Sequence, residues 1–186
     1  MTENTKYIEL LKDTDKIYSI HYSCSGFYNG DSLAPTMVSI SVTKVDNFET
    51  RDFSLCDYLN EGLCLMDAER KLLNSFVDFC KSVENLVFVN WKMETLYYGF
   101  KAINARCENF GIYDFEFYNL KTIDISENFL LNLENALKQY NSFSPAFLSG
   151  KEELNCFQKR SYNLVKYSIN SKSKGIATIF KKNFCN

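Results

Sequence analysis

The chain has 186 residues, of which 46% are hydrophobic and 16% aromatic, so its composition supplies a sizeable core and argues against disorder. Its net charge is −2, no apolar run is long enough to span a membrane, and its first residues lack the basic and apolar regions of a secretory signal. We therefore expect one cytoplasmic domain over residues 1–186, without a membrane partner.

Three strands are predicted near the N-terminus. Residues 16–23 are rich in strand-forming side chains, residues 36–45 alternate polar and apolar side chains, and residues 47–55 offer a third, shorter strand. The segment between the first two strands is rich in turn residues, so we expect these strands to pair as a hairpin.

Helices and strands then alternate. Residues 66–83 have the pattern of an amphipathic helix, and the wholly apolar run 86–89 is typical of a strand buried on both faces. A second helix is predicted over 94–110, ended by Gly111, and a short strand lies within 117–126.

Helices are expected to fill the rest of the chain. One helix, capped by Asp124 or Ser126, should run to Tyr140, and two more should cover about 151–167 and 171–182.

The predicted fold is therefore α/β. Its mixed central sheet would hold three antiparallel strands followed by alternating strands and helices, with helices on its faces. Ligands in such folds bind beside the carboxyl ends of the strands. Residues 21–26 and 90–94 follow two of these ends, so we expect a ligand site there.

The order of elements resembles the ribonuclease-H-like fold and, more narrowly, the DEDD-type 3′–5′ exonucleases. The resemblance covers a core of about 16–170 and leaves a basic C-terminal helix of about 171–183. The second motif of this family follows the fourth strand and reads approximately Asn-x-x-Phe-Asp. It is similar to Asn90-Trp91-Lys92-Met93-Glu94, in which Met replaces Phe and Glu replaces Asp.

The other family motifs lack their carboxylates. The first strand of these exonucleases ends in Asp-x-Glu, which binds two divalent cations, but residues 20–25 contain no acidic side chain. Their closing helix carries a further Asp, and residues 156–168 contain neither Asp nor Glu. Glu94 alone does not hold two metal ions. The resemblance therefore implies an eroded catalytic site, and we expect no metal or other cofactor.

Several single residues are candidates for the site. His21, the only histidine, is either a catalytic base or a strand residue with one hydrogen bond, and Glu94 is the other residual catalytic candidate. Trp91 could stack on bases together with Tyr97, Tyr98 and Phe100. The alternative is that Tyr97, Phe100 and Ile103 form a core stripe at helical spacing. The candidates for the binding groove are Ser23, Asn90, Trp91, Lys92, Tyr97 and Tyr162.

Charge is distributed unevenly. Residues 151–186 hold eight Lys or Arg and two acids, which is a net charge of +6, and the remainder of the chain carries −8. This segment is either a phosphate-binding surface or a solvated face packed on an acidic neighbour. The candidates for phosphate contact are Lys159, Arg160, Lys166, Lys172 and Lys174. The seven scattered cysteines have no metal-ligand spacing and should be free thiols.

Three hypotheses about function follow. The leading one is a catalytically eroded exonuclease-like pseudoenzyme, which serves as a nucleic-acid or protein binding or scaffolding module in a nucleic-acid-handling pathway. The first alternative is an active 3′–5′ exonuclease with a rearranged site, which would need Mg²⁺ or Mn²⁺. The second is a protein-interaction subunit without a nucleic-acid role.

Overall fold

The structure is a computed structural model that describes residues 16–27, 34–95, 98–140 and 147–185. Within these ranges the strands form one five-stranded sheet in the order β3-β2-β1-β4-β5. β1 is antiparallel to β2 and parallel to β4, β2 is antiparallel to β3, and β4 is parallel to β5. The strands are β1 (Ile17–Cys24), β2 (Met37–Lys44), β3 (Thr50–Ser54), β4 (Val87–Asn90) and β5 (Lys121–Asp124).

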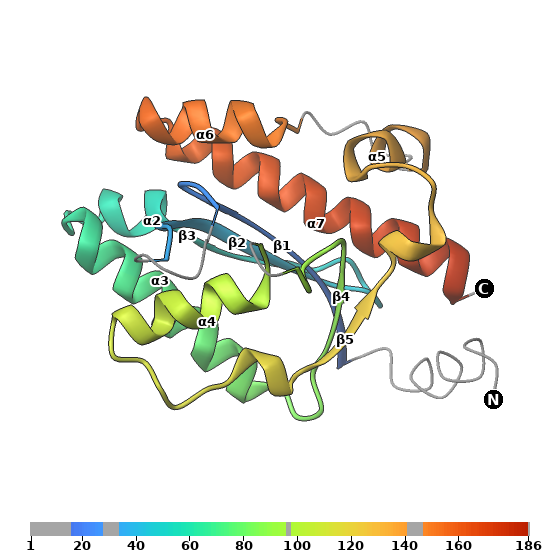
Figure 1. Ribbon diagram of the computed structural model, residues 1–186, viewed down its shortest axis with the longest axis horizontal. Helices are drawn as coiled ribbons and strands as arrows, with labels where there is room; N and C mark the ends of the chain where they lie inside the picture. The colour runs from blue at the N-terminus through green and yellow to red at the C-terminus, as the bar shows by residue number, and fades with distance from the viewer. Residues whose placement is uncertain (1–15, 28–33, 96–97, 141–146, 186) are drawn as a thin grey trace.

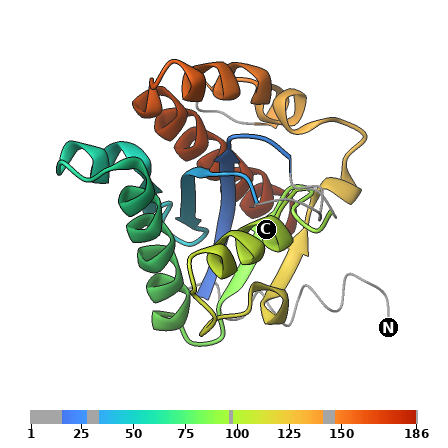
Figure 2. The ribbon, with the colours of Figure 1, turned by 60° about the vertical axis from the view of Figure 1, so that its left-hand side comes forward.

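Helices cover both faces of the sheet (Figure 1). They are α2 (Leu55–Asn60), α3 (Leu65–Ser82), α4 (Phe100–Asn109), α5 (Leu133–Tyr140), α6 (Gly150–Gln158) and α7 (Tyr162–Phe184). Figure 2 shows α3 and α4 on one side of the sheet and α7 on the other. α7 packs across β1 and β2, and α5 and α6 pack against α7. The predicted α/β architecture with a mixed sheet is confirmed, and its strand order is compatible with a ribonuclease-H-like fold.

The two faces of β1 and β2 differ in chemistry. Ile20, Tyr22, Ile40 and Val42 point into the apolar core beneath α3 and α4. The side chains of the alternate positions are small and polar, yet they are buried because α7 covers them: Ser19, Ser39, Ser41 and Thr43. Small hydroxyl side chains let the helix lie close to the sheet, and Ser173 of α7 contacts Ser19 (Oγ–Oγ 3.1 Å) and Thr43 (Oγ–Oγ1 3.0 Å).

The second predicted helix begins later than the sequence pattern indicates. The pattern predicts a start at residue 94, but α4 begins at Phe100. Gly99 has φ 110°, which a helix does not allow, and it forms an isolated bridge with Glu94. The amide of Phe100 donates to the carbonyl of Met93 (N···O 3.0 Å). The backbone at residues 93–94 and 99–100 therefore pairs where the first turns of the helix were predicted.

Two other predictions of helix bounds are wrong. α5 begins at Leu133, and residues 126–128 before it form one 3₁₀ turn. The break between the last two helices lies at residues 159–161, so that α7 is one continuous 23-residue helix through the predicted gap near residue 170. The sequence pattern does not predict α2, between β3 and α3.

All seven cysteines lie within the described ranges and are free thiols. None of the described helices combines the length and the apolar character that crossing a membrane requires.

Candidate functional site

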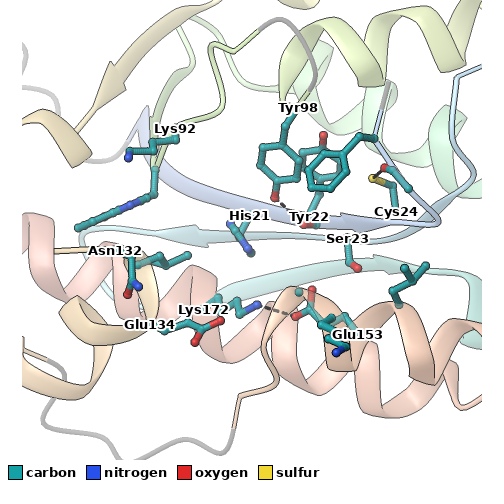
Figure 3. Close-up of a pocket in the computed structure, with 17 residues that line it drawn as sticks. His21, Tyr22, Ser23, Cys24, Lys92, Tyr98, Asn132, Glu134, Glu153 and Lys172 are labelled. Atoms are coloured by element: carbon teal, nitrogen blue, oxygen red, sulfur yellow. Dashed lines mark hydrogen bonds and ion pairs between the residues drawn. The ribbon is translucent and has the colours of Figure 1, made fainter. Parts of the chain in front are cut away.

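A crevice of about 700 Å³ opens beside the carboxyl end of β1 (Figure 3). Its floor is β1, from His21 to Cys24, and its walls come from the turn after β4, the N-terminal ends of α5 and α6, and α7. Because β4 is parallel to β1, both strands end at the same edge of the sheet. The crevice thus lies where the fold pattern places a ligand site, and its volume is typical of sites for small molecules.

A buried ion pair forms one wall. Lys172 of α7 donates from Nζ to Oε1 of Glu153 of α6 at 2.7 Å, and each side chain is only 5% exposed. The Ser168 hydroxyl donates to the same oxygen at 2.6 Å, and Ser23 also hydrogen-bonds the carboxyl group. Burial raises the pKa of Glu153, while Lys172 and the two hydroxyl groups act in the opposite direction.

His21 lies on the floor beside this pair (Figure 3). It is 6% exposed, and its Nδ1 has no hydrogen-bond partner among the residues that the structure describes. Burial lowers the pKa of His21 well below its ordinary value, and the charge of Lys172 lowers it further. The imidazole is therefore neutral at pH 7, with one nitrogen as a donor and the other as an acceptor.

This neutral histidine has a measurable consequence for stability. Between the lowered pKa of the folded state and the ordinary pKa near 6.5, the unfolded chain binds a proton that the folded chain does not. The free energy of unfolding should therefore rise with pH across this window, by up to about 1.4 kcal/mol per pH unit, and this contribution should level off above it. Urea unfolding from pH 5 to 8, compared with His21→Gln, checks this, and an equal slope in the variant would contradict it.

Aromatic side chains form the opposite side of the crevice. The rings of Tyr22 and Tyr98 stack with their centroids 4.4 Å apart, and the Tyr98 hydroxyl donates to the Tyr22 carbonyl (2.9 Å). The Tyr22 hydroxyl accepts from the amide of Gly99 (2.7 Å). These contacts hold Tyr98 at the wall, where its ring centroid is 6.4 Å from that of His21.

The turn after β4 presents Lys92. Asn90 accepts from the Met93 amide (Oδ1···N 3.0 Å), and Asp124 accepts from the Lys92 amide (Oδ1···N 3.1 Å). Lys92 has φ 56° and an exposed side chain. Trp91 is 4% exposed and stacks on Phe129 with ring centroids 5.5 Å apart. Asn90 and Asp124 therefore shape the turn, and Lys92 is its exposed cation.

Two helix N-termini border the crevice. α6 begins with a capping box in which Ser149 and Glu152 satisfy each other's backbone amides. At α5, Asn132 accepts from the Asn135 amide (Oδ1···N 2.9 Å). Residues at both helix starts line the crevice, including Lys151 and Glu134. Helix N-termini carry partial positive charge, which Lys151 supplements and Glu134 opposes.

Only some of the site residues predicted from the sequence lie together at the crevice. His21, Ser23, Trp91, Lys92 and Lys172 line the crevice. Tyr97 lies outside the described residues. Three others lie elsewhere: Asn90 is fully buried below the turn, Glu94 is exposed and accepts a hydrogen bond from Thr122, and Tyr162 packs against Phe157.

The five candidates for phosphate contact do not form one surface. Lys172 is buried, and Lys166 is paired with Asp57 (Nζ···Oδ1 2.7 Å). Lys159 and Arg160 are exposed in the turn between α6 and α7, at the opposite end of α6 from α5 (Figure 1). Lys174 is exposed on α7. The positive charge of the segment is therefore dispersed, and the phosphate role of its exposed residues stays a prediction.

Sequence reasoning missed the partner of Lys172. Glu153 and Lys172 come from separate helices, and no local pattern relates them. One signal was present: Lys172 falls on the apolar stripe of α7 with Val165, Ile169 and Ile176, all of which are fully buried. A lysine on such a stripe needs a buried partner.

Among the described residues, no group of three or more His, Cys, Asp or Glu side chains has the arrangement of a metal site. No protein-family model matches the chain, and a search of curated proteins finds no relative.

Proposed function

We propose that the chain is a nucleic-acid-binding module on an exonuclease-like fold, which holds its ligand in the crevice without a divalent metal. The observation that carries this proposal is the wall of the crevice formed by the closing helix α7. The resemblance leads to a carboxylate on the closing helix within residues 156–168, where the chain has none. One turn further along, α7 contributes the ammonium of Lys172 to the crevice, paired with Glu153. Because Glu153 balances its charge, Lys172 offers hydrogen-bond donors at this place without a metal ion, and the attraction for phosphate comes from the rim of the crevice.

The rim of the crevice suits a phosphate backbone. Lys92 and Lys151 are exposed there, next to the N-termini of α5 and α6. Both features attract phosphate oxygens. Glu134 lines the same rim, and the Glu152 carboxylate takes part in the cap at the start of α6. The net attraction is therefore modest, and binding should weaken clearly as the salt concentration rises.

Aromatic side chains supply a second kind of contact. Phe27 lines the crevice and is 83% exposed. Tyr98 lies on the wall. Such rings stack on bases with little regard to sequence, and each stacked base contributes about 1–3 kcal/mol of binding free energy.

The test is binding of fluorescently labelled ten-nucleotide single strands by anisotropy, in EDTA and at two salt concentrations. We expect saturable, salt-dependent binding that the double variant Lys92→Glu/Lys151→Glu weakens at least about tenfold, since it reverses two phosphate contacts. The matched control is Lys121→Glu, an exposed lysine at the amino end of β5 and so at the opposite edge of the sheet from the crevice, which should change the affinity less than about twofold.

Other results would support the alternatives. Binding that does not depend on salt, or no binding, would contradict the proposal and favour a protein-interaction subunit. Cleavage of the strand in Mg²⁺ or Mn²⁺ that Glu94→Gln abolishes would favour an active exonuclease. If Lys159→Glu lowers the affinity more than the double variant does, the binding site lies at the turn between α6 and α7.

A further inference from the structure

The floor of the crevice holds a polar atom that the protein itself does not satisfy. His21 is more than nine-tenths buried, its Nδ1 has no partner among the described residues, and the residue lines the crevice. Leaving a buried polar atom without a hydrogen bond is costly, typically about 1–3 kcal/mol. The nitrogen itself is enclosed, so a ligand group reaches it only when the imidazole turns toward the crevice that it lines. That contact would remove the cost, which makes His21 a point of recognition.

Lys172 offers further hydrogen-bond donors beside His21. Its ammonium has three protons, and its one hydrogen bond within the described structure goes to Glu153. The side chain lines the crevice, and its charge acts on His21. The floor therefore combines an imidazole nitrogen and an ammonium that still has protons to donate to an oxygen atom.

The net charge of the floor indicates whether the ligand group that binds there is a phosphate or a neutral group. Lys172 and Glu153 face His21 from α7 and α6, and as an ion pair they carry no net charge. A phosphate at this depth would meet the Glu153 carboxylate and would have to leave water for a neutral site, which is unfavourable. A hydroxyl carries no charge to desolvate, and hydrogen bonds to the floor offset its loss of water. It also donates and accepts, so it satisfies His21 Nδ1 in either tautomer.

We propose that the floor of the crevice, made by His21 and the Glu153–Lys172 pair, binds a sugar hydroxyl, so that the protein selects ribose over deoxyribose. The inference rests on the proposed function, since it assigns the substrate class of the same crevice. Phosphates lie at the cationic rim with Lys92 and Lys151, and the ribose 2′-hydroxyl points to the floor. The 2′-hydroxyl is the group by which proteins distinguish RNA from DNA.

The experiment compares three labelled ten-nucleotide strands of one base sequence: RNA, DNA and 2′-O-methyl RNA. We expect RNA to bind about tenfold more tightly than DNA, the effect of one satisfied buried hydrogen bond. The 2′-O-methyl strand should bind no better than DNA, because it lacks the donor and adds bulk. These comparisons change only the ligand, so they need no protein variant to fold.

Two protein variants then assign the preference to His21. In His21→Leu the ratio of the RNA and DNA affinities should fall to about one. In His21→Asn, whose amide lies near the position of Nδ1, part of the preference should remain. Thermal unfolding of both variants shows whether they are folded.

Each outcome has a distinct meaning. Equal affinity for RNA and DNA, with binding still lost in the Lys92→Glu/Lys151→Glu variant, overturns the ribose inference and leaves the proposed function standing. A preference for RNA that His21→Leu retains also overturns it. If no strand binds, the proposed function fails together with the inference.

Discussion

Replacing Lys172 by Met lowers the free energy of unfolding by about 3–5 kcal/mol, because it leaves the Glu153 carboxylate buried without its counter-ion. Glu153 is 4% exposed, and the hydrogen bonds from Ser168 and Ser23 are then all that remain for its charge. The chain offers a matched control in Lys166→Met, whose pair with Asp57 is 29% and 39% exposed. That variant should lose less than about 1 kcal/mol.

The pH dependence identifies the cause. Burial already raises the pKa of Glu153, and loss of the ammonium raises it further. The folded variant then binds a proton more readily than the unfolded chain does. Its stability deficit should shrink as the pH falls from 7 toward the unfolded pKa of Glu, near 4.3. Urea unfolding at pH 5 and pH 7 measures this change, and the double variant Lys172→Met/Glu153→Gln should recover part of the loss. A deficit no larger than that of Lys166→Met would contradict the assignment.

Replacing Gly99 by Ala should destabilise the protein by at least about 3 kcal/mol, since the change combines a steric clash with backbone strain. A Cβ atom at Gly99 would lie 1.6 Å from the carbonyl oxygen of Met93, and the residue has φ 110°. The control is Gly62→Ala. Gly62 also has a positive φ, 89°, but a Cβ atom there would meet no other atom within 4 Å among the described residues. The Gly62→Ala variant should lower the free energy of unfolding by only about 1–2 kcal/mol.

The change at Gly99 should also affect the crevice. Its amide hydrogen-bonds the Tyr22 hydroxyl, and Tyr98, its neighbour in sequence, forms part of the aromatic wall. Thermal unfolding gives the stability of the two glycine variants. If the two variants lose equal stability, the positive φ accounts for the whole effect at Gly99 and the close approach to Met93 contributes nothing.

Local hydrophobic patterns predicted three of the elements. The alternation in residues 36–45, the amphipathic helix of 66–83 and the apolar strand of 86–89 correspond to β2, α3 and β4. These patterns depend only on residues that are close in the sequence, so they can be recognised without knowledge of the tertiary contacts. A glycine inside an apolar helical pattern is typical of close backbone approach, and Gly99 does lie against the backbone of Met93.

The same glycine shows where local patterns fail. Its φ belongs to a turn set by the contact with Met93 and by the hydrogen bond to Tyr22, a residue 77 positions away. The polar face of β2 is similar: an alternating pattern does not show whether water or α7 covers Ser39 and Ser41. The Glu153–Lys172 pair also depends on how two helices pack, and no spacing in the sequence specifies that.

The location of the crevice could be predicted although its chemistry could not. Parallel strands end at one edge of the sheet, which predicts that residues 21–26 and 90–94 face a site, and His21, Ser23 and Lys92 line the crevice there. The match to the exonuclease motif predicts that Glu94 joins them. The turn before α4 instead directs it to Thr122 of β5.

The most direct test of the crevice as the ligand site uses His21, the only histidine in the chain. Selective ¹³C labelling of histidine gives one imidazole signal, which is followed by NMR as unlabelled ten-nucleotide RNA is added in EDTA. We expect the signal to shift saturably, at the concentrations at which anisotropy shows binding, and the shift to be smaller with DNA. Binding by anisotropy without any change in the His21 signal would place the ligand elsewhere and contradict the assignment of this crevice.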